Sequence, residues 1–273
     1  VAEVERITEA KPIEGRLVVQ PARLASVASR VEGPGEELDL TVNAQPALLA
    51  ASIAAQRALE VALGDEAGRF GPPTYFAGHS MGQYSAMVAA GVLELGDAVR
   101  LVRERGRLMQ ASSSDGAMAA VIGLPDEQNE ELLAVGAAEG IITIANRNSP
   151  GQIVISGQRA AVEAAAEAAR ELGARRSLVL PVSVAAHSPL MAQAAEGMRQ
   201  ALADVPDSTP TAPLQANADA LVLSDGEACR DELIDHLTRG VDWVTAVETM
   251  VAAGTDTFVE IGPGKGLSGL VRR

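Results

Sequence analysis

Hydrophobic positions along the chain follow two periods, and the periods alternate in the order typical of an α/β protein. Short apolar runs, such as residues 73–77 and 118–123, have the length of buried strands. Stretches with apolar residues three and four positions apart, such as 47–63 and 97–112, predict amphipathic helices. Strands that alternate with helices in this way predict an α/β body.

A second pattern begins at Gly116 and predicts a smaller unit within the body. From there the expected elements follow in the order β-α-β-β-α-β, which is that of a ferredoxin-like unit. The turn residues Asn148-Ser149-Pro150-Gly151 separate the two middle strands and are a hairpin signal. We therefore expect an α/β body formed by residues 1–115 and 183–273, with an inserted ferredoxin-like subdomain at 116–182.

Gly78-His79-Ser80-Met81-Gly82 is a G-x-S-x-G sequence between the predicted strand 73–77 and a predicted alanine-rich helix. A tight turn in this context projects a serine hydroxyl toward a base and toward the free N–H groups of a helix start. Side chains larger than hydrogen at the two glycines would collide with the neighbouring strand and helix. We interpret Ser80 as a nucleophile; the alternative is a glycine-rich turn without a catalytic role.

The chain has three histidines, His79, His187 and His236, so few residues can serve as the base for a serine. His79 adjoins Ser80, but consecutive residues at a sharp turn point apart. His187 follows the last predicted strand of the subdomain, and a strand end returning to the body is a suitable place for a base. The alternative is that His187 only caps the next helix.

Arg105 lies within the apolar stripe of the predicted helix 97–112. The stripe consists of Ala98, Leu101, Val102, Leu108 and Met109. A guanidinium that faces the core is costly unless it meets a carboxylate or a phosphate. Two explanations are therefore open, a clamp for a substrate carboxylate and a buried ion pair with one of the acidic residues.

Composition narrows the functional classes. The net charge of −14 excludes a typical nucleic-acid binder, which needs a basic face. One cysteine cannot form an internal disulfide, and no Cys/His cluster has metal-ligand spacing. No signal peptide is visible, and no apolar run approaches the length of a membrane span. We expect a cytoplasmic, monomeric protein without a membrane partner or a bound metal.

Taken together, the motifs resemble those of the malonyl-CoA:acyl-carrier-protein transacylases and of the acyltransferase domains of fatty-acid and polyketide synthesis. The likeness covers about residues 36–273 in the family's order. It rests on Gln45-Pro46-Ala47-Leu48-Leu49, the segment 78–86, Arg105-Gly106-Arg107-Leu108-Met109-Gln110, the segment 146–152, His187 in its setting, and Glu260-Ile261-Gly262-Pro263-Gly264.

The resemblance implies an α/β-hydrolase-like body with a mostly parallel sheet and a ferredoxin-like subdomain. It implies ping-pong transfer of malonyl from malonyl-CoA, without a bound cofactor, to the phosphopantetheine thiol of an acyl carrier protein. Ser80 would carry the acyl group, with His187 as general base and acid. The Met81 N–H would stabilise the oxyanion, Arg105 would bind the malonyl carboxylate, and the backbone of His236 would orient the base.

The resemblance fails at one place. Family members begin with a strand and a G-Q-G-S-Q loop, and nothing between Val1 and Glu36 matches these. We expect this strand and its glutamine loop to be missing. Two other hypotheses stay open, a serine hydrolase or thioesterase with the same nucleophile turn and an inactive acyltransferase-like fragment.

Overall fold

The computed structural model describes residues 11–13, 16–18, 40–64, 71–112 and 115–273. The expectation of a missing N-terminal strand and loop falls mostly outside these residues. Within that region the structure describes two short strands, β1 (Lys11–Ile13) and β2 (Arg16–Val18), which pair antiparallel with each other.

The body of the molecule is an α/β arrangement, as the pattern predicts. Its described sheet has the order β3-β8-β9, in which β3 and β8 are parallel and β8 and β9 are antiparallel. The expected mostly parallel sheet is thus only half parallel within the described residues. The elements are β3 (Phe76–Ala77), β8 (Leu214–Gln215), β9 (Val222–Leu223), α4 (Thr41–Leu63), α5 (Gly82–Ala89), α6 (Leu95–Ser112), α9 (Ala192–Leu202), α10 (Gly226–Arg239), α11 (Trp243–Ala252) and α12 (Gly266–Val271).

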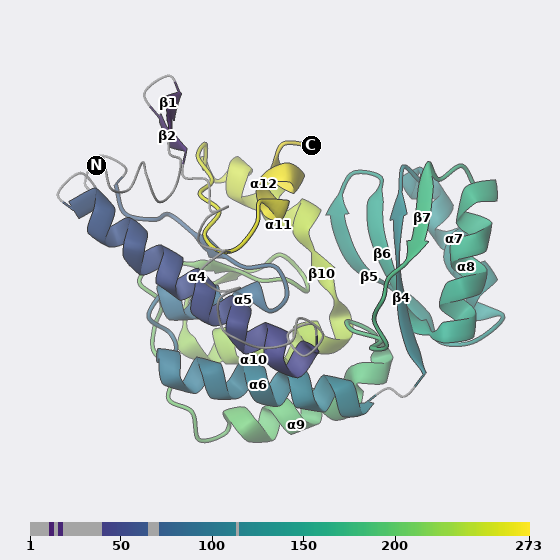
Figure 1. Ribbon diagram of the computed structural model, residues 1–273, viewed down its shortest axis with the longest axis horizontal. Helices are drawn as coiled ribbons and strands as arrows, with labels where there is room; N and C mark the ends of the chain where they lie inside the picture. The colour runs from purple at the N-terminus through teal and green to yellow at the C-terminus, as the bar shows by residue number, and fades with distance from the viewer. Residues whose placement is uncertain (1–10, 14–15, 19–39, 65–70, 113–114) are drawn as a thin grey trace.

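A second sheet contains the four strands of the predicted insert. These strands are β4 (Gly116–Ile122), β5 (Ile142–Ser149), β6 (Gln152–Gln158) and β7 (Arg176–Val179). Neighbouring strands run antiparallel in the order β5-β6-β4-β7, and α7 (Asn129–Ala137) and α8 (Arg159–Glu171) cover one face of the sheet (Figure 1). The domain boundaries at 116 and 182 stay a prediction.

One strand of the second sheet comes from outside the predicted insert. The strand β10 (Val241–Asp242) pairs parallel with β5, with Val241 opposite Asn146. The spacing of apolar residues from 241 to 253 is typical of a helix, but the chain first pairs with the sheet, and α11 begins at Trp243. The small sheet is therefore continuous with the C-terminal part of the body.

The helix α4 begins earlier than expected, at Thr41, so Pro46 lies within it and not in its first turn. The first turn of α4 packs against α6. A Cβ atom at Gly106 would lie 2.7 Å from the Cα of Val42, so only glycine allows this approach. Gln45 is consequently placed on a buried helical face, and this matters for the site below.

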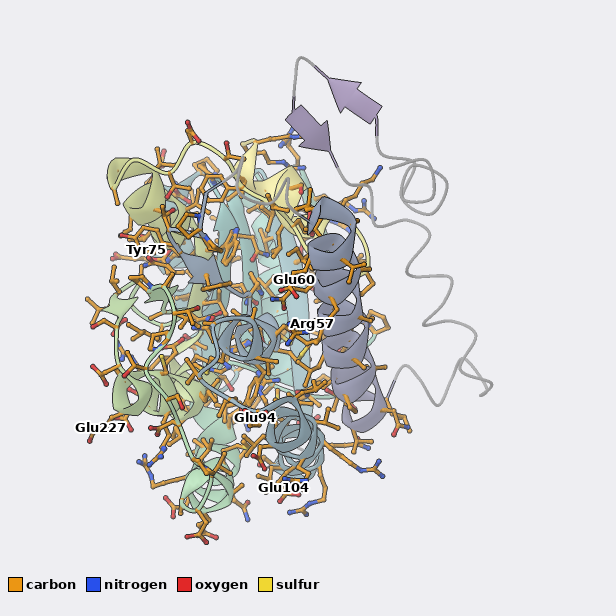
Figure 2. The ribbon with its side chains drawn as sticks, turned by 90° about the vertical axis from the view of Figure 1, so that its left-hand side faces the viewer. Arg57, Glu60, Tyr75, Glu94, Glu104 and Glu227 are labelled. Atoms are coloured by element: carbon orange, nitrogen blue, oxygen red, sulfur yellow. The ribbon has the colours of Figure 1, made fainter. Side chains whose placement is uncertain are left out.

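By length and composition alone, α4 is the one described helix that could cross a membrane. Core helices of soluble proteins satisfy the same criteria. Leu49 and Ile53 of α4 belong to the main hydrophobic cluster, whereas Arg57 and Glu60 are exposed and form an ion pair of 2.9 Å (Figure 2).

The apolar residues of 257–261 are typical of a last buried strand, but the segment does not form one. This segment has no strand structure, and Phe258, Val259 and Ile261 are exposed. A strand needs a pairing partner for its N–H and C=O groups, and no described segment pairs with this one. Within this segment, the Glu260 carboxylate accepts the N–H groups of Leu267 and Ser268 and so caps α12.

Candidate active site

Ser80 lies at the turn between β3 and α5, and its backbone is strained. Its φ of 53° is in the left-handed region that non-glycine residues rarely adopt. A Cβ atom at Gly78 would lie 2.1 Å from the carbonyl carbon of Gly82, which explains the first glycine of the motif. The expectation for the second glycine is wrong, because a Cβ at Gly82 would meet nothing within 4 Å.

The structure brings Ser80 and His187 together. The Ser80 hydroxyl donates to Nε2 of His187 over 2.8 Å, and the Nδ1–H of His187 donates to the backbone carbonyl of His236 over 2.6 Å. The carbonyl can only accept, and this assigns the proton to Nδ1 and leaves Nε2 as the acceptor. His187 also has a positive φ, 59°, so both members of the pair sit on strained backbone.

His187 is buried, and its surroundings keep the ring neutral. Burial, and after it the nearby Arg105 charge, lower the pKa of His187 to about 3 against the opposing effect of the His236 carbonyl. A neutral imidazole can accept the serine proton at neutral pH. The His187 ring bonds to the Ser80 hydroxyl through Nε2 and to the His236 carbonyl through Nδ1. A histidine that only capped the next helix would need neither of these two hydrogen bonds.

Arg105 is buried and is surrounded by neutral acceptors. Its Nη1 donates to Oε1 of Gln45 over 2.8 Å, and its Nη2 donates to Ser80 Oγ over 3.1 Å. No carboxylate among the described residues pairs with it, and its Nε has no partner there. Burial lowers the pKa of Arg105, yet an arginine stays charged. The ion-pair explanation therefore finds no partner among the described acidic residues.

His236 contributes more than its backbone. Its Nε2 lies 3.3 Å from Nη2 of Arg105, and its Nδ1 lies 2.7 Å from the carbonyl oxygen of Glu232. Arginine only donates and a carbonyl only accepts, so His236 is neutral with its proton on Nδ1. Burial and the Arg105 charge lower its pKa well below the ordinary value, which keeps Nε2 available as an acceptor.

Three residues of the site were not predicted from the sequence to have these roles. Gln45 holds Arg105, Asn217 contacts the Ser80 backbone, and Glu232 contacts Asn217. A signal existed for Glu232, because it shares the buried stripe of α10 with Cys229, Leu233 and His236. The argument that singled out Arg105, a charged residue in a core-facing stripe, applies to it equally.

The third histidine joins the turn to the second sheet. His79 Nε2 bonds to Oδ1 of Asn148 on β5 over 2.8 Å, and its ring packs against Trp243 with centroids 5.6 Å apart. It is thus turned away from Ser80 Oγ, as the turn geometry predicts. The remaining predicted site residue, Met81, immediately precedes α5, so its N–H belongs to the first turn, where no intrahelical acceptor exists.

In the part of the chain that the structure describes, no group of His, Cys, Asp and Glu residues has the geometry to hold a metal ion. The chemical groups that do converge are a serine hydroxyl, a neutral imidazole, a buried guanidinium and a helix start. Such a site can form and break a serine ester while binding an anion beside it. Together, the fold and the site are those of an acyltransferase with an α/β fold.

The comparisons with known proteins agree with that class. The protein-family model for the acyl transferase domain matches residues 18–269, and the chain belongs to this family. The malonyl CoA-acyl carrier protein transacylase of Escherichia coli K12 is 43% identical over 244 residues, which are 89% of this chain and 77% of that protein. The corresponding protein of Bacillus subtilis 168 is 43% identical over 247 residues, 89% of this chain and 75% of that protein.

Solved structures give the same result. The acyl-carrier-protein S-malonyltransferase from Bartonella henselae matches with a TM-score of 0.82 and 43% identity, covering 92% of this chain and 79% of that one. A malonyl-transacylase in complex with a type II PKS acyl-carrier protein matches with a TM-score of 0.83 and 36% identity, covering 100% of this chain and 85% of that one.

Proposed function

We propose that this chain transfers a malonyl group from malonyl-CoA to the phosphopantetheine thiol of an acyl carrier protein, by a ping-pong reaction with Ser80 as the acyl carrier. The observation that carries the proposal is the placement of Arg105. A buried guanidinium without a described carboxylate partner lies 3.1 Å from the nucleophilic oxygen. A substrate with a free carboxylate close to its thioester fits that arrangement.

In the first half-reaction, Ser80 Oγ attacks the thioester carbonyl while Nε2 of His187 takes the hydroxyl proton. The carbonyl oxygen becomes an oxyanion, which the N–H of Met81 stabilises at the start of α5. The C–S bond then breaks, the imidazolium returns its proton to the CoA sulfur, and the malonyl ester of Ser80 is left. The backbone carbonyl of His236 keeps the His187 ring in the required tautomer throughout.

Arg105 selects the substrate and also affects the base. Gln45 and His236 accept two of its N–H groups and fix the plane of the guanidinium. A malonyl carboxylate would replace the weak contact with Ser80 by a charge-assisted one. Neutralising Arg105 also removes a charge that lowers the pKa of His187, so the bound substrate makes the imidazole a stronger base.

In the second half-reaction, the carrier-protein thiol attacks the malonyl ester and passes its proton to His187. Collapse of the intermediate releases the Ser80 oxygen, which recovers the proton from the imidazolium. The reaction is balanced without a redox partner, a metal or another cofactor, and malonyl-CoA enters only as a substrate. We place the reaction in the cytoplasm, where CoA thioesters and carrier proteins meet.

The test is mass spectrometry of the intact protein after mixing with malonyl-CoA, with Ser80→Ala as the control. We expect one malonyl adduct that Ser80→Ala lacks, and we expect it to move to the thiol of a phosphopantetheinylated carrier protein. Rapid release of free malonate without the carrier would support a serine hydrolase instead. Absence of any adduct would support an inactive acyltransferase-like fragment.

A further inference from the structure

The strained backbone of Ser80 is held by one buried amide side chain. Asn217 accepts the Ser80 N–H on Oδ1 over 2.8 Å and donates from Nδ2 to the carbonyl of Gly78 over 3.0 Å. One contact requires an acceptor and the other a donor, so the orientation of the amide is determined. Asn217 therefore spans the turn on both sides of the nucleophile's peptide.

Asn217 is held in turn by its own backbone. Its N–H donates to Oε1 of Glu232 over 2.6 Å, and its carbonyl accepts the N–H of Asp242 over 2.7 Å. Glu232 is 5% exposed, so its carboxylate is part of the interior. The path from Glu232 to Ser80 thus consists of two consecutive short hydrogen bonds with no exposed group between them.

Glu232 and the carbonyl that orients the base belong to the same stretch of α10. His236 lies one helical turn after Glu232, and its Nδ1–H donates to the Glu232 carbonyl. The carbonyl of His236 then accepts from His187. One rigid helix consequently contacts the Ser80 side of the pair through Asn217 and the His187 side directly.

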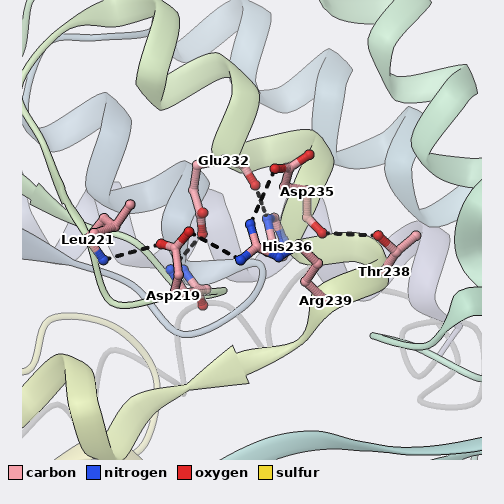
Figure 3. A network of polar contacts seen from close by, with 8 residues as sticks. Asp219, Leu221, Glu232, Asp235, His236, Thr238 and Arg239 are labelled. Carbon is pink, nitrogen blue, oxygen red and sulfur yellow. Dashed lines mark hydrogen bonds and ion pairs between the residues drawn. The ribbon is translucent and has the colours of Figure 1, made fainter.

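The surroundings of Glu232 offer no described cation to its carboxylate. Figure 3 shows that Arg239 instead faces Asp219 and Asp235, to which it lies 3.3 and 3.5 Å away. The pKa of Glu232 is raised to about 7, chiefly by burial; hydrogen bonding to Asn217 opposes this effect, and the charges of Asp219 and Asp235 add to it. A buried carboxylate without a cation costs stability, so a purely structural explanation would favour an apolar residue here.

We propose that Glu232 is a positioning residue for Ser80, acting through Asn217. This inference rests on the proposed role of Ser80 as the nucleophile, but on no property of malonyl or of a carrier protein. Removing the carboxylate leaves the Asn217 N–H without its acceptor, the amide loosens, and the hydroxyl spends less time in line with Nε2 of His187. The reactivity of Ser80 should fall while substrate binding is unaffected.

The experiment measures labelling of Ser80 by a fluorophosphonate, which needs neither CoA nor a carrier protein. In that reaction the Oγ–P bond forms, the P–F bond breaks, fluoride leaves, and His187 takes the hydroxyl proton. We expect Glu232→Ala to lower the maximal labelling rate about tenfold with little change in the half-saturating probe concentration. Asp231→Ala removes an exposed carboxylate from the neighbouring position of α10 and should label at the unaltered rate.

Two further variants separate positioning from general damage. Glu232→Gln retains an oxygen acceptor and should label within about threefold of the unaltered protein. The double variant Asn217→Ala/Glu232→Ala should label no more slowly than Asn217→Ala alone, because both changes remove the same support. If Glu232→Ala does not fold, as judged by its thermal melt, Glu232→Leu takes its place.

The proposal is overturned if Glu232→Ala (or Leu) labels as fast as Asp231→Ala, if Glu232→Gln is as slow as the alanine variant, or if the two losses in the double variant add. These outcomes are independent of malonyl transfer. A protein that labels with the probe but carries no malonyl would refute the proposed function while leaving this inference testable. Labelling that persists in Ser80→Ala would instead refute the assignment of the nucleophile.

Discussion

Arg105 and Arg107 are only two residues apart on α6, but they lie on opposite faces of the helix, one buried and the other exposed. Arg107 is exposed and donates from Nε and Nη2 to the two carboxylate oxygens of Glu104, over 2.8 and 2.6 Å. Arg105 is 2% exposed and contacts only neutral groups among the described residues. Glu104 raises the pKa of Arg107 through its hydrogen bonds, whereas burial lowers the pKa of Arg105.

The Arg107 charge is already paired with a carboxylate, whereas the Arg105 charge is available to pair with an anionic ligand. The exposed pair is screened by water and contributes little to stability or recognition. The buried guanidinium has lost its hydration and gained no described counter-charge, so an anionic ligand can recover much of that loss on binding. Burial without a carboxylate, and not the presence of arginine itself, is therefore what points to a substrate site.

The largest expected effect comes from removing the buried arginine. Arg105→Ala should slow malonyl loading of Ser80 by about a hundredfold, because only malonyl presents a second carboxylate to the guanidinium. Acetyl loading should change by less than about threefold. Rates of adduct formation by quenched-flow mass spectrometry give both values. Arg107→Ala is the matched control, and equal losses for malonyl and acetyl would refute the clamp.

A smaller effect is expected when the arginine stays but loses a support. Gln45→Ala removes the acceptor of Nη1 and should slow malonyl loading about fivefold, with acetyl loading nearly unchanged. Gln56→Ala is the control on the same helix, because Gln56 bonds only to the exposed Glu60 among the described groups. A loss shared by both glutamine variants would mean that α4 packing, not the Arg105 contact, is responsible.

Glu232 extends the comparison to a buried carboxylate. An ordinary glutamate has a pKa of 4.5, and the folded protein raises it to about 7, so the folded state binds the proton more tightly. The contribution of the protonated Glu232 to the free energy of unfolding is fully present below pH 4.5 and is lost as the pH rises through about 7. Glu232→Gln should therefore raise the melting temperature by roughly 3–6 °C at pH 8 and by much less at pH 4.5. A difference that does not change with pH would show that the carboxyl titrates normally.

The smallest effect is expected at the exposed pair. Glu104→Gln breaks the ion pair with Arg107 and should change the melting temperature by less than about 2 °C. Salt should reduce even this difference, because exposed charges are screened. A larger, salt-insensitive change would mean that pairing at the surface of α6 matters as much as burial within it, which would undo the comparison.

Sequence patterns were sufficient where the chemistry is local. The G-x-S-x-G turn located Ser80, the interrupted apolar stripe located Arg105, and the position after the last strand of the insert led to His187. The geometry of these three residues is as close as acyl transfer needs, with Ser80 Oγ within 3.1 Å of both partners. Their catalytic roles nevertheless stay predictions until the variants are measured.

Patterns failed where the outcome depends on distant packing. The apolar segment 257–261 looks like a strand, but strand structure requires a neighbour that no local pattern can supply. Pro46 is typical of the first turn of a helix, but α4 begins at Thr41, and this first turn lies against the backbone of Gly106 on the distant helix α6. Asn217 has no local signature at all, because its role arises from contact with a turn 137 residues away.

The two-residue strand β10 has a mechanical consequence. It pairs with β5 of the small sheet, with Val241 opposite Asn146. A Cβ atom on the preceding Gly240 would lie 2.6 Å from the carbonyl oxygen of Ala145, so the two backbones approach closely there. The second residue of β10, Asp242, donates its N–H to the carbonyl of Asn217, the residue that contacts the Ser80 backbone. A movement of the small sheet relative to the body would therefore act on the backbone of Asn217, whose side chain accepts the Ser80 N–H.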